Sequence, residues 1–189
     1  MRSAELDAWL PDPQVTARHR RTSTADADVL WQVAQELRLS DTRTLGRLVR
    51  WRIPGTPADL RFSELFARYP FAVLAEGERW SVSGLCGRIW TFTRDYGRLD
   101  GPDDFASWDI PGTVRVLFGH WVEELETGSA LVSEARVAPV DRSARLQLRA
   151  LWLVIRHFER TIGAEPLPLA VARAEAREPV SRGPTRAGR

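Results

Sequence analysis

The sequence predicts an α+β protein in which a curved antiparallel sheet wraps around a long C-terminal helix, with short helices after the first strand. Residues 112–125 and 129–140 alternate as two strands, and Thr127-Gly128 suits a two-residue hairpin loop because glycine accepts a positive φ. After Asp141 the apolar spacing becomes helical and stays so for about five turns. Residues 14–22 form an earlier strand, which helical patterns follow. A sheet closed by a helix in this way encloses a pocket.

The first part of the chain predicts one strand and three helices. In strand 14–22, His19 shares a face with small apolar residues because side chains alternate. Thr24 is a suitable N-cap for the first helix. Three helical patterns follow the strand, over 25–37, 42–53 and 60–68.

The middle and the end of the chain predict further strands and one more helix. Four short strands are expected, at 71–75, 80–86, 88–93 and around 105–108. Pro166 and Pro168 interrupt the helical pattern after the long helix, and a last helical piece covers 167–177. The chain is expected to divide into an N-terminal extension (1–13), one domain (14–178) and a disordered tail (179–189).

Composition places the chain among globular proteins. Its 189 residues are 43% hydrophobic and include eight tryptophans, which is enough for one domain with a sizeable core. No run approaches the roughly 18–20 apolar residues of a membrane span, and the N-terminus lacks the apolar region of a secretory signal. The single cysteine, Cys86, makes no internal disulfide and is expected to be a buried, inert thiol. These features predict a cytoplasmic protein.

The charge pattern argues against nucleic acid and against a metal cofactor. All 27 basic residues are arginine, with no lysine or asparagine, and this bias is typical of a GC-rich genome rather than of a polyanion-binding protein. Net charge is only +2, and no basic arm, zinc-finger spacing or aromatic RNA-binding motif occurs. Three histidines without a paired spacing predict no metal site. We expect no cofactor.

Four segments in sequence order resemble a known superfamily. They read VTARHRRTSTADADVLWQVAQEL near the start, GLCGRIW at 84–90, DFASWDIPG at 104–112, and ALVSEARVAPVDRSARLQLRALWLVIR at 130–156. The chain resembles the START-like, or polyketide cyclase and Bet v 1-like (SRPBCC), helix-grip superfamily, in particular its bacterial branch without assigned function. Relatives would show Thr-Glu-Thr-Arg where this chain has Ser133-Glu134-Ala135-Arg136, and their last helix would continue past Thr161.

The resemblance implies a ligand-binding fold. Members of the superfamily bind lipids, sterols, polyketides and other hydrophobic molecules between sheet and helix, and some of them cyclise or aromatise polyketides there. Since one fold hosts many functions, the resemblance leaves the choice among them open.

Counting outward from the Thr127-Gly128 turn predicts which residues face the pocket. This register pairs His120 with Ala135 and Val122 with Ser133, and it puts the smaller, more apolar side chains on the concave face. Gly84 either leaves room for a ligand or marks a bulge. The predicted ligand-binding residues are Trp80, Val82, Gly84, Phe118, His120, Ser133, Ala135, Leu151 and Ile155.

Polar residues on these strands allow two interpretations each. His19 and His120 lie on apolar faces and are either pocket acids and bases or core histidines bound to a backbone carbonyl. Glu134 and Arg136 share the opposite face, where they can pair, and they become polar anchors of the pocket if the faces are exchanged.

The last helix predicts a buried stripe and a basic stripe. The buried stripe comprises Leu148, Leu151, Val154, Ile155, Phe158 and Ile162. The basic stripe comprises Arg142, Arg145, Arg149, Arg156 and Arg160. The basic stripe either binds an anionic partner or is a solvated face whose arginine stems pack on apolar surface.

Three functions are compatible with these observations. The first is binding of a small hydrophobic or aromatic molecule in the cavity. The second is a cyclase or aromatase, in which His19, His120 or an acid moves the proton of an aldol closure and dehydration. The third is a protein that docks a partner and whose cavity is closed.

Overall fold

The computed structural model describes residues 3–91, 95–162 and 164–177, without the side chains at positions 4 and 154–162. The strands are β1 (Val15–Ser23), β2 (Ala72–Gly77), β3 (Trp80–Gly87), β4 (Val114–Glu124) and β5 (Ser129–Pro139). The helices are the 3₁₀ elements η1 (Ser3–Ala8) and η2 (Leu39–Asp41) and the α-helices α1 (Ala27–Glu36), α2 (Leu45–Arg52), α3 (Phe62–Phe66), α4 (Pro102–Ala106), α5 (Arg142–Ile162) and α6 (Pro166–Arg177).

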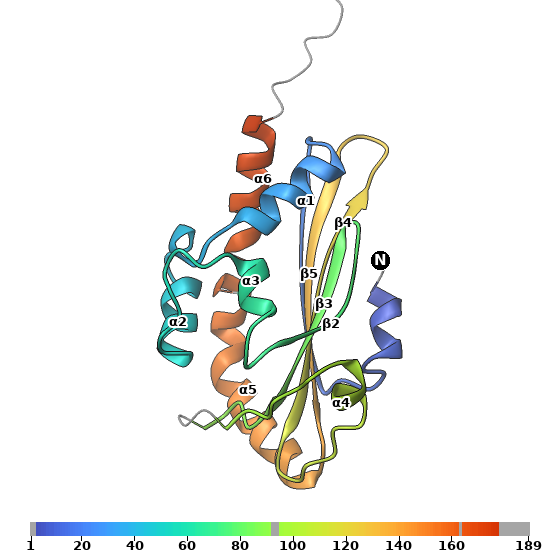
Figure 1. Cartoon of the computed structure of the whole chain (residues 1–189), viewed down its shortest axis with the longest axis vertical. Helices are drawn as coiled ribbons and strands as arrows, with labels where there is room; N and C mark the ends of the chain where they lie inside the picture. Colours follow the sequence, from blue (N-terminus) through green and yellow to red (C-terminus); the bar gives the residue numbers. More distant parts are fainter. Residues whose placement is uncertain (1–2, 92–94, 163, 178–189) are drawn as a thin grey trace, which may run out of the picture.

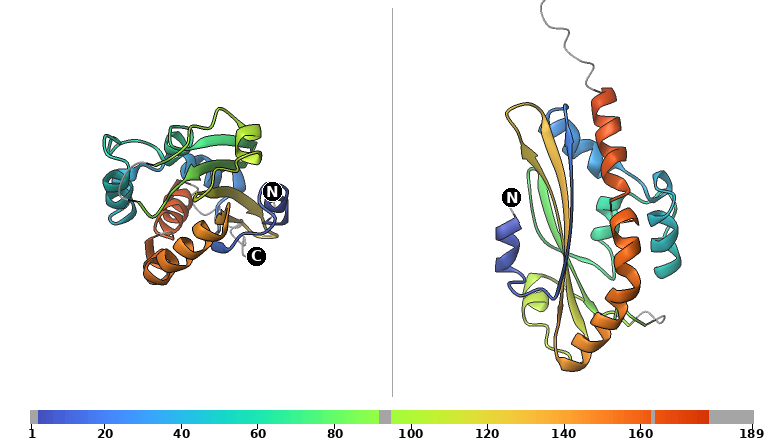
Figure 2. Two further views of the ribbon diagram at one scale, coloured as in Figure 1. Left: turned by 90° about the horizontal axis from the view of Figure 1, so that it is seen from below. Right: turned by 180° about the vertical axis from the view of Figure 1, so that it is seen from behind.

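The strands form one antiparallel sheet in the order β1-β5-β4-β3-β2. Helices α1, α3, α5 and α6 lie on one side of this sheet, and η1 and α4 lie on the other side (Figure 1; Figure 2). The predicted α+β class and helix-grip arrangement are confirmed, with the long helix α5 following the sheet. No helix within the described ranges is long and apolar enough to cross a membrane.

Several element boundaries differ from the prediction for local reasons. Asp26, not Thr24, caps α1, because its carboxylate accepts the N–H of Asp28 at 2.8 Å. The strand predicted around 105–108 is wrong: helix α4 begins at Pro102, has two aspartates in its first turn and ends at Ala106, and residues 107–108 lie outside any strand. The strand predicted at 88–93 is also wrong over 88–91, which lie outside any strand; residues 92–94 fall outside the described residues.

The β4–β5 hairpin keeps its predicted faces although its register differs by two residues. His120 pairs with Ser133, not with Ala135, because the loop has four residues instead of two. Gly128 in this loop has φ 77°, as expected for a glycine-dependent turn. A shift of two residues leaves every side chain on its face, since side chains alternate with a period of two.

The outer face of the sheet is covered by the N-terminal segment and α4. Leu6, Leu10 and Phe105 are fully buried there, against strand residues such as Leu117 and Trp121. The predicted division into an extension (1–13) and a domain (14–178) stays a prediction, and the predicted tail (179–189) lies outside the described residues.

The last two helices of the chain, α5 and α6, pack on the other face of the sheet. Ala144 and Leu148 of α5 are buried against β1, β4 and β5, as the predicted stripe requires for Leu148. After the interruption at Pro166, α6 buries Leu167 and Ala170 against α1 and neighbouring strands, which confirms the predicted last helical piece.

Candidate ligand-binding cavity

A cavity of about 670 Å³ lies between the inner face of the sheet and the helices. Its floor consists of residues from all five strands, and its roof comes from α1, α3, Trp152 of α5 and the start of α6. The side chains that line it are mainly aliphatic and aromatic. The fold therefore leaves a cavity on the face of the sheet that α1, α3, α5 and α6 cover.

Most of the strand residues predicted for ligand binding line this cavity. Phe118 and His120 of β4 and Ser133 and Ala135 of β5 are on its floor. Trp80 borders the cavity while also packing against the cluster on the outer face. Their contact with a ligand stays a prediction.

Val82 and Gly84 do not line the cavity, contrary to the prediction. Val82 is fully buried in the outer-face cluster, and a Cβ on Gly84 would lie 2.6 Å from the ring of Phe105. Gly84 thus permits close packing of α4 rather than ligand entry. Ser81 and Ser83 of the same strand line the cavity in their place. The prediction failed because both faces of this sheet are covered, so the more apolar face of β3 is not the cavity face.

The predicted contributions from the last helix are only partly described. Leu151 is half-buried and is not among the lining residues, whereas its neighbour Trp152 is. The side chain of Ile155 lies outside the described residues. Periodicity identified the helix, but it did not distinguish the part that packs on the sheet from the part that faces the cavity.

Glu134 and Arg136 are buried on the outer face, so their alternative role as anchors of the pocket is wrong. Arg136 Nε donates to Glu134 Oε1 at 2.7 Å, and its Nη1 donates to Asp7 Oδ1 at 2.6 Å. Ser3 completes the group, because its hydroxyl donates to Glu134 Oε2 at 2.6 Å and its carbonyl accepts from Arg136 Nη2 at 2.9 Å. This buried pair fixes the N-terminal segment to the sheet.

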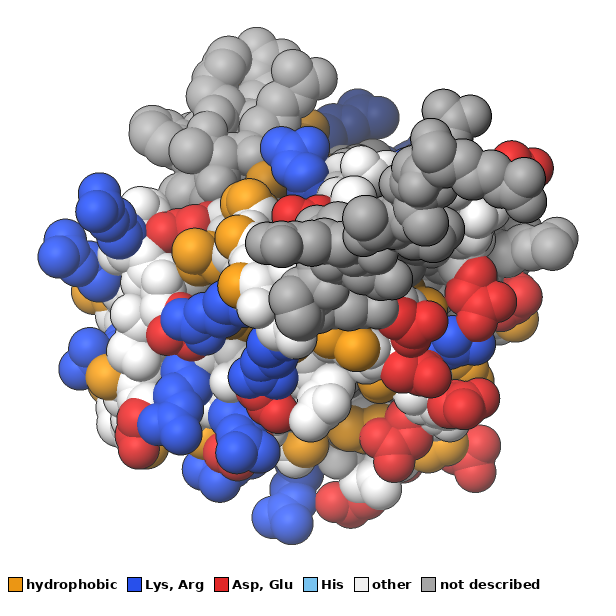
Figure 3. All heavy atoms as spheres, turned by 90° about the horizontal axis from the view of Figure 1, so that it is seen from above, with side chains coloured by type: hydrophobic (Ala, Val, Ile, Leu, Met, Phe, Trp, Pro, Cys, Tyr) orange, Lys and Arg blue, Asp and Glu red, His pale blue; other side chains and the backbone are white. Residues whose placement is uncertain are grey.

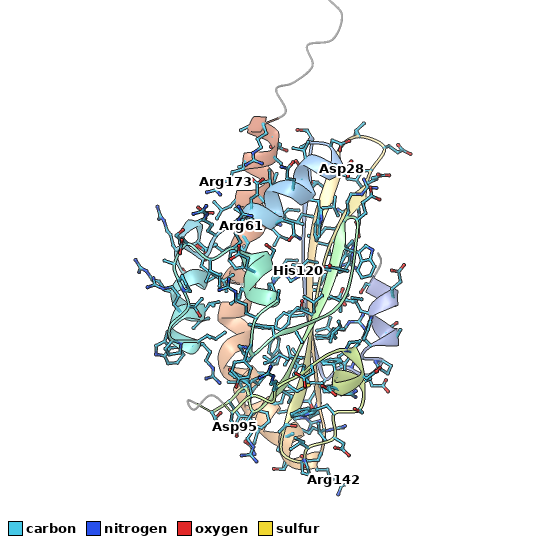
Figure 4. The ribbon with its side chains drawn as sticks, in the orientation of Figure 1. Asp28, Arg61, Asp95, His120, Arg142 and Arg173 are labelled. Carbon is cyan, nitrogen blue, oxygen red and sulfur yellow. The ribbon has the colours of Figure 1, made fainter. Side chains whose placement is uncertain are left out.

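His120 lies in an aromatic group between the sheet and α3 (Figure 4). The Phe66 ring is centred 4.7 Å from the His120 ring and 5.2 Å from the Phe118 ring, and Phe71 extends the group. No hydrogen bond involves the His120 ring among the described residues. Its polar atoms are therefore available to a group on a bound molecule.

Burial lowers the pKa of His120 to about 4. The half-exposed ring faces the cavity rather than the outer surface, and aromatic side chains surround it. It is therefore uncharged at neutral pH, when it offers one hydrogen-bond donor and one acceptor.

We expect this histidine to make folding sensitive to moderate acid. The unfolded chain binds a proton at this side chain below about pH 6.5, whereas the folded protein does so only near pH 4. The free energy of unfolding is therefore unaffected by this side chain above pH 6.5 and falls as the pH drops below that value, with a loss of about 3 kcal/mol by pH 4. Urea unfolding of wild type and His120→Gln at pH 7.5, 5.5 and 4.5 measures this loss, since the variant lacks the titrating ring. If the free energies of unfolding of the two proteins fall in parallel with pH, the prediction is wrong.

Ion pairs and hydrogen bonds join α6 and the residue before it to η2 and to the start of α2. Arg173 of α6 makes a two-pronged ion pair with Asp41 at 2.7 and 2.8 Å, and it holds the pKa of that carboxyl below its usual value. Glu165 accepts the N–H groups of Thr44 and Leu45 at the start of α2. Burial tends to raise the pKa of Glu165, but these hydrogen bonds outweigh it, so the pKa lies below its usual value. The junction of α5 and α6 is thus tied to the segment before α2.

The basic stripe predicted on α5 is described for three of its five members. Arg142, Arg145 and Arg149 are exposed, and the side chains of Arg156 and Arg160 lie outside the described residues. Arg142 is at the end of the molecule, far from His120 (Figure 4). Seen from above, basic side chains gather on the side where α2 lies and acidic ones on the opposite side (Figure 3). An anionic partner for the stripe stays a prediction.

Comparison with known proteins gives likeness only at the level of structure. No protein-family model and no curated protein sequence matches the chain. Protein MLL2253 from Mesorhizobium loti is 11% identical, with a TM-score of 0.36 over 86% of this chain and 98% of its own. The Zhui aromatase/cyclase from Streptomyces sp. R1128 is 16% identical, with a TM-score of 0.32 over 86% of this chain and 94% of its own.

Proposed function

We propose that this protein binds a small, mostly apolar molecule in the cavity between its sheet and its helices. The observation that carries the proposal is the cavity itself, whose volume of about 670 Å³ falls in the range of ligand sites. Its aliphatic and aromatic walls favour transfer of an apolar ligand from water. Among the described lining residues other than histidine, Glu76 is the one ionisable side chain, and it is exposed at the edge of the sheet.

The cavity supports binding more directly than it supports a cyclase or aromatase. His19 and His120 both line it, but Ser133 lies between them in the sheet, so about 10 Å separates their strands. They do not form a catalytic pair. His120 is uncharged and able to accept a proton, yet no described carboxylate orients its ring. A binding function requires only the cavity, and a closed-cavity docking protein would not retain one of this size.

Filling the cavity is expected to weaken binding strongly. Ala135 is small and lies on the floor, so Ala135→Trp extends an indole into the space that a ligand would occupy. Titration of an environment-sensitive apolar dye should show micromolar affinity for the wild type and at least tenfold weaker affinity for the variant. Quenching of the lining tryptophans, Trp31, Trp80 and Trp152, reports the binding.

A matched variant separates cavity filling from a general effect of tryptophan. Ala150 is exposed on α5 and is not among the lining residues, so Ala150→Trp should bind the dye like the wild type. Equal dye affinity in wild type and Ala135→Trp, at concentrations that leave the protein folded, would contradict the proposed function.

A further inference from the structure

One row of polar residues crosses the whole floor of the cavity. In the sheet His19 pairs with Ser133, Ser133 with His120, and His120 with Ser81. Ser81 pairs in turn with Glu76 on the edge strand β2. All five of these residues line the cavity, one from each strand. We call them the polar row.

The neighbouring rows are apolar at their centres. On one side of the polar row Ala135 pairs with Phe118, and on the other side Leu131 pairs with Val122. The polar groups of the floor are therefore concentrated in this row, and Ser83, which pairs with Phe118 in the next row, carries the one other hydroxyl among the described floor residues. A register irregularity between Val73 and Ala75 of β2 keeps Glu76 on this face.

Three members of the polar row make no side-chain hydrogen bond within the described part of the chain. They are the hydroxyls of Ser81 and Ser133 and the ring of His120. Each is half-buried, and its open side faces the cavity. Polar groups in such surroundings require hydrogen-bond partners, because leaving them unpaired in a dehydrated site costs free energy. A ligand that displaces water from the floor has to supply these partners.

The spacing of the row defines the shape of a matching ligand. Neighbouring strands lie about 4.8 Å apart, so Ser81 and Ser133, on either side of His120, are separated by about 10 Å. The neutral imidazole and the two hydroxyls each donate and accept, so they suit hydroxyl and carbonyl groups without charge.

We propose that the cavity selects elongated, uncharged molecules with an apolar body and hydrogen-bonding groups along one edge, and that this edge lies across the strands on the polar row. This proposal rests on the proposed binding function and adds the class of ligand. The apolar body fills the space below α1 and α3, and the polar edge meets Ser81, His120 and Ser133. An apolar molecule without such groups fits the same space but leaves these side chains unpaired.

Two probes that share one apolar body test the proposal. They are biphenyl and 4,4′-dihydroxybiphenyl, whose hydroxyls are separated by about the Ser81–Ser133 distance across two strand intervals. Tryptophan quenching gives the dissociation constant of each probe. The wild type should bind the dihydroxy probe about tenfold more tightly, as two net hydrogen bonds provide. The Ser81→Ala/Ser133→Ala variant should lose most of this preference and keep its affinity for biphenyl.

Ser83→Ala provides the matched control. Ser83 lies on the same strand as Ser81 and lines the cavity, but it belongs to the next row, opposite Phe118. This variant should keep the preference of the wild type. Two outcomes would overturn the proposed role of the polar row while leaving the proposed binding function intact. One is that the wild type binds both probes with equal affinity, and the other is that the double variant keeps the preference for the dihydroxy probe. Failure of both probes to bind the folded wild type would overturn the proposed function, and this proposal with it.

Discussion

Arg136→Leu is expected to lower the free energy of unfolding by about 3–5 kcal/mol, because it leaves the Glu134 carboxylate buried without its principal partner. Glu134 is 1% exposed and Arg136 is 6% exposed, so water cannot replace the missing guanidinium. The variant also removes the donors to Asp7 and to the Ser3 carbonyl, which hold the N-terminal segment. Urea unfolding at neutral pH measures the loss.

Two further variants separate the charge effect from loss of packing. Glu134→Leu/Arg136→Leu removes both buried charges and should be more stable than Arg136→Leu, since no buried charge is left unpaired and Asp7, which loses its partner, is 57% exposed. Arg20→Leu breaks a pair with Glu123 at 2.9 Å whose partners are 39% and 29% exposed, and it should cost less than about 1 kcal/mol. A double variant no more stable than Arg136→Leu would mean that shape, rather than charge, dominates at this site.

Leu148→Asp is expected to cost about 3–5 kcal/mol, and it tests whether α5 holds the sheet. Leu148 is 1% exposed and packs against β1, β4 and β5, so an aspartate there loses apolar burial and puts a carboxylate in an apolar cluster. Thermal unfolding should show a melting temperature lower by about 6–20 °C, since each kcal/mol shifts it by about 2–4 °C in a chain of this length.

The same helix offers a control for any general effect of a new acid. Leu146 is 65% exposed, two positions earlier on α5, and Leu146→Asp should leave the melting temperature within a few degrees of wild type. A similar loss in both variants would show that the charge acts on the helix itself and not on its packing.

The sequence predicted the elements whose pattern is long and regular. Helix α5 and the β4–β5 hairpin were predicted near their observed bounds, and the cavity face of the hairpin was predicted with Phe118 and His120 on it. The face survived a register error of two residues because the side-chain period is also two. Patterns of this kind depend on neighbouring residues alone.

Features that depend on distant partners were not predictable in this way. Arg136 is 129 positions from Asp7, and no local pattern indicates that the N-terminal segment covers the outer face. Because that face is covered, apolar Val82 packs in the cluster on the outer face and polar Ser81 faces the cavity. An alternating strand is usually taken to turn its apolar side chains toward the interior of the fold and its polar ones toward solvent, and β3 does not follow this pattern. The pairing of Ser81 with His120 belongs to the β3–β4 register, which no turn pattern in the sequence predicted.

Coverage of both faces has a consequence for how this protein tolerates change. Along β4, Leu117 and Trp121 are fully buried beneath the N-terminal segment, whereas Phe118 and His120 line the cavity. Substitutions at the first set disturb close packing, while those at the second set alter the walls of a cavity. Alternate positions of one strand therefore answer to different selective pressures, so ligand preference is able to diverge while the scaffold is retained.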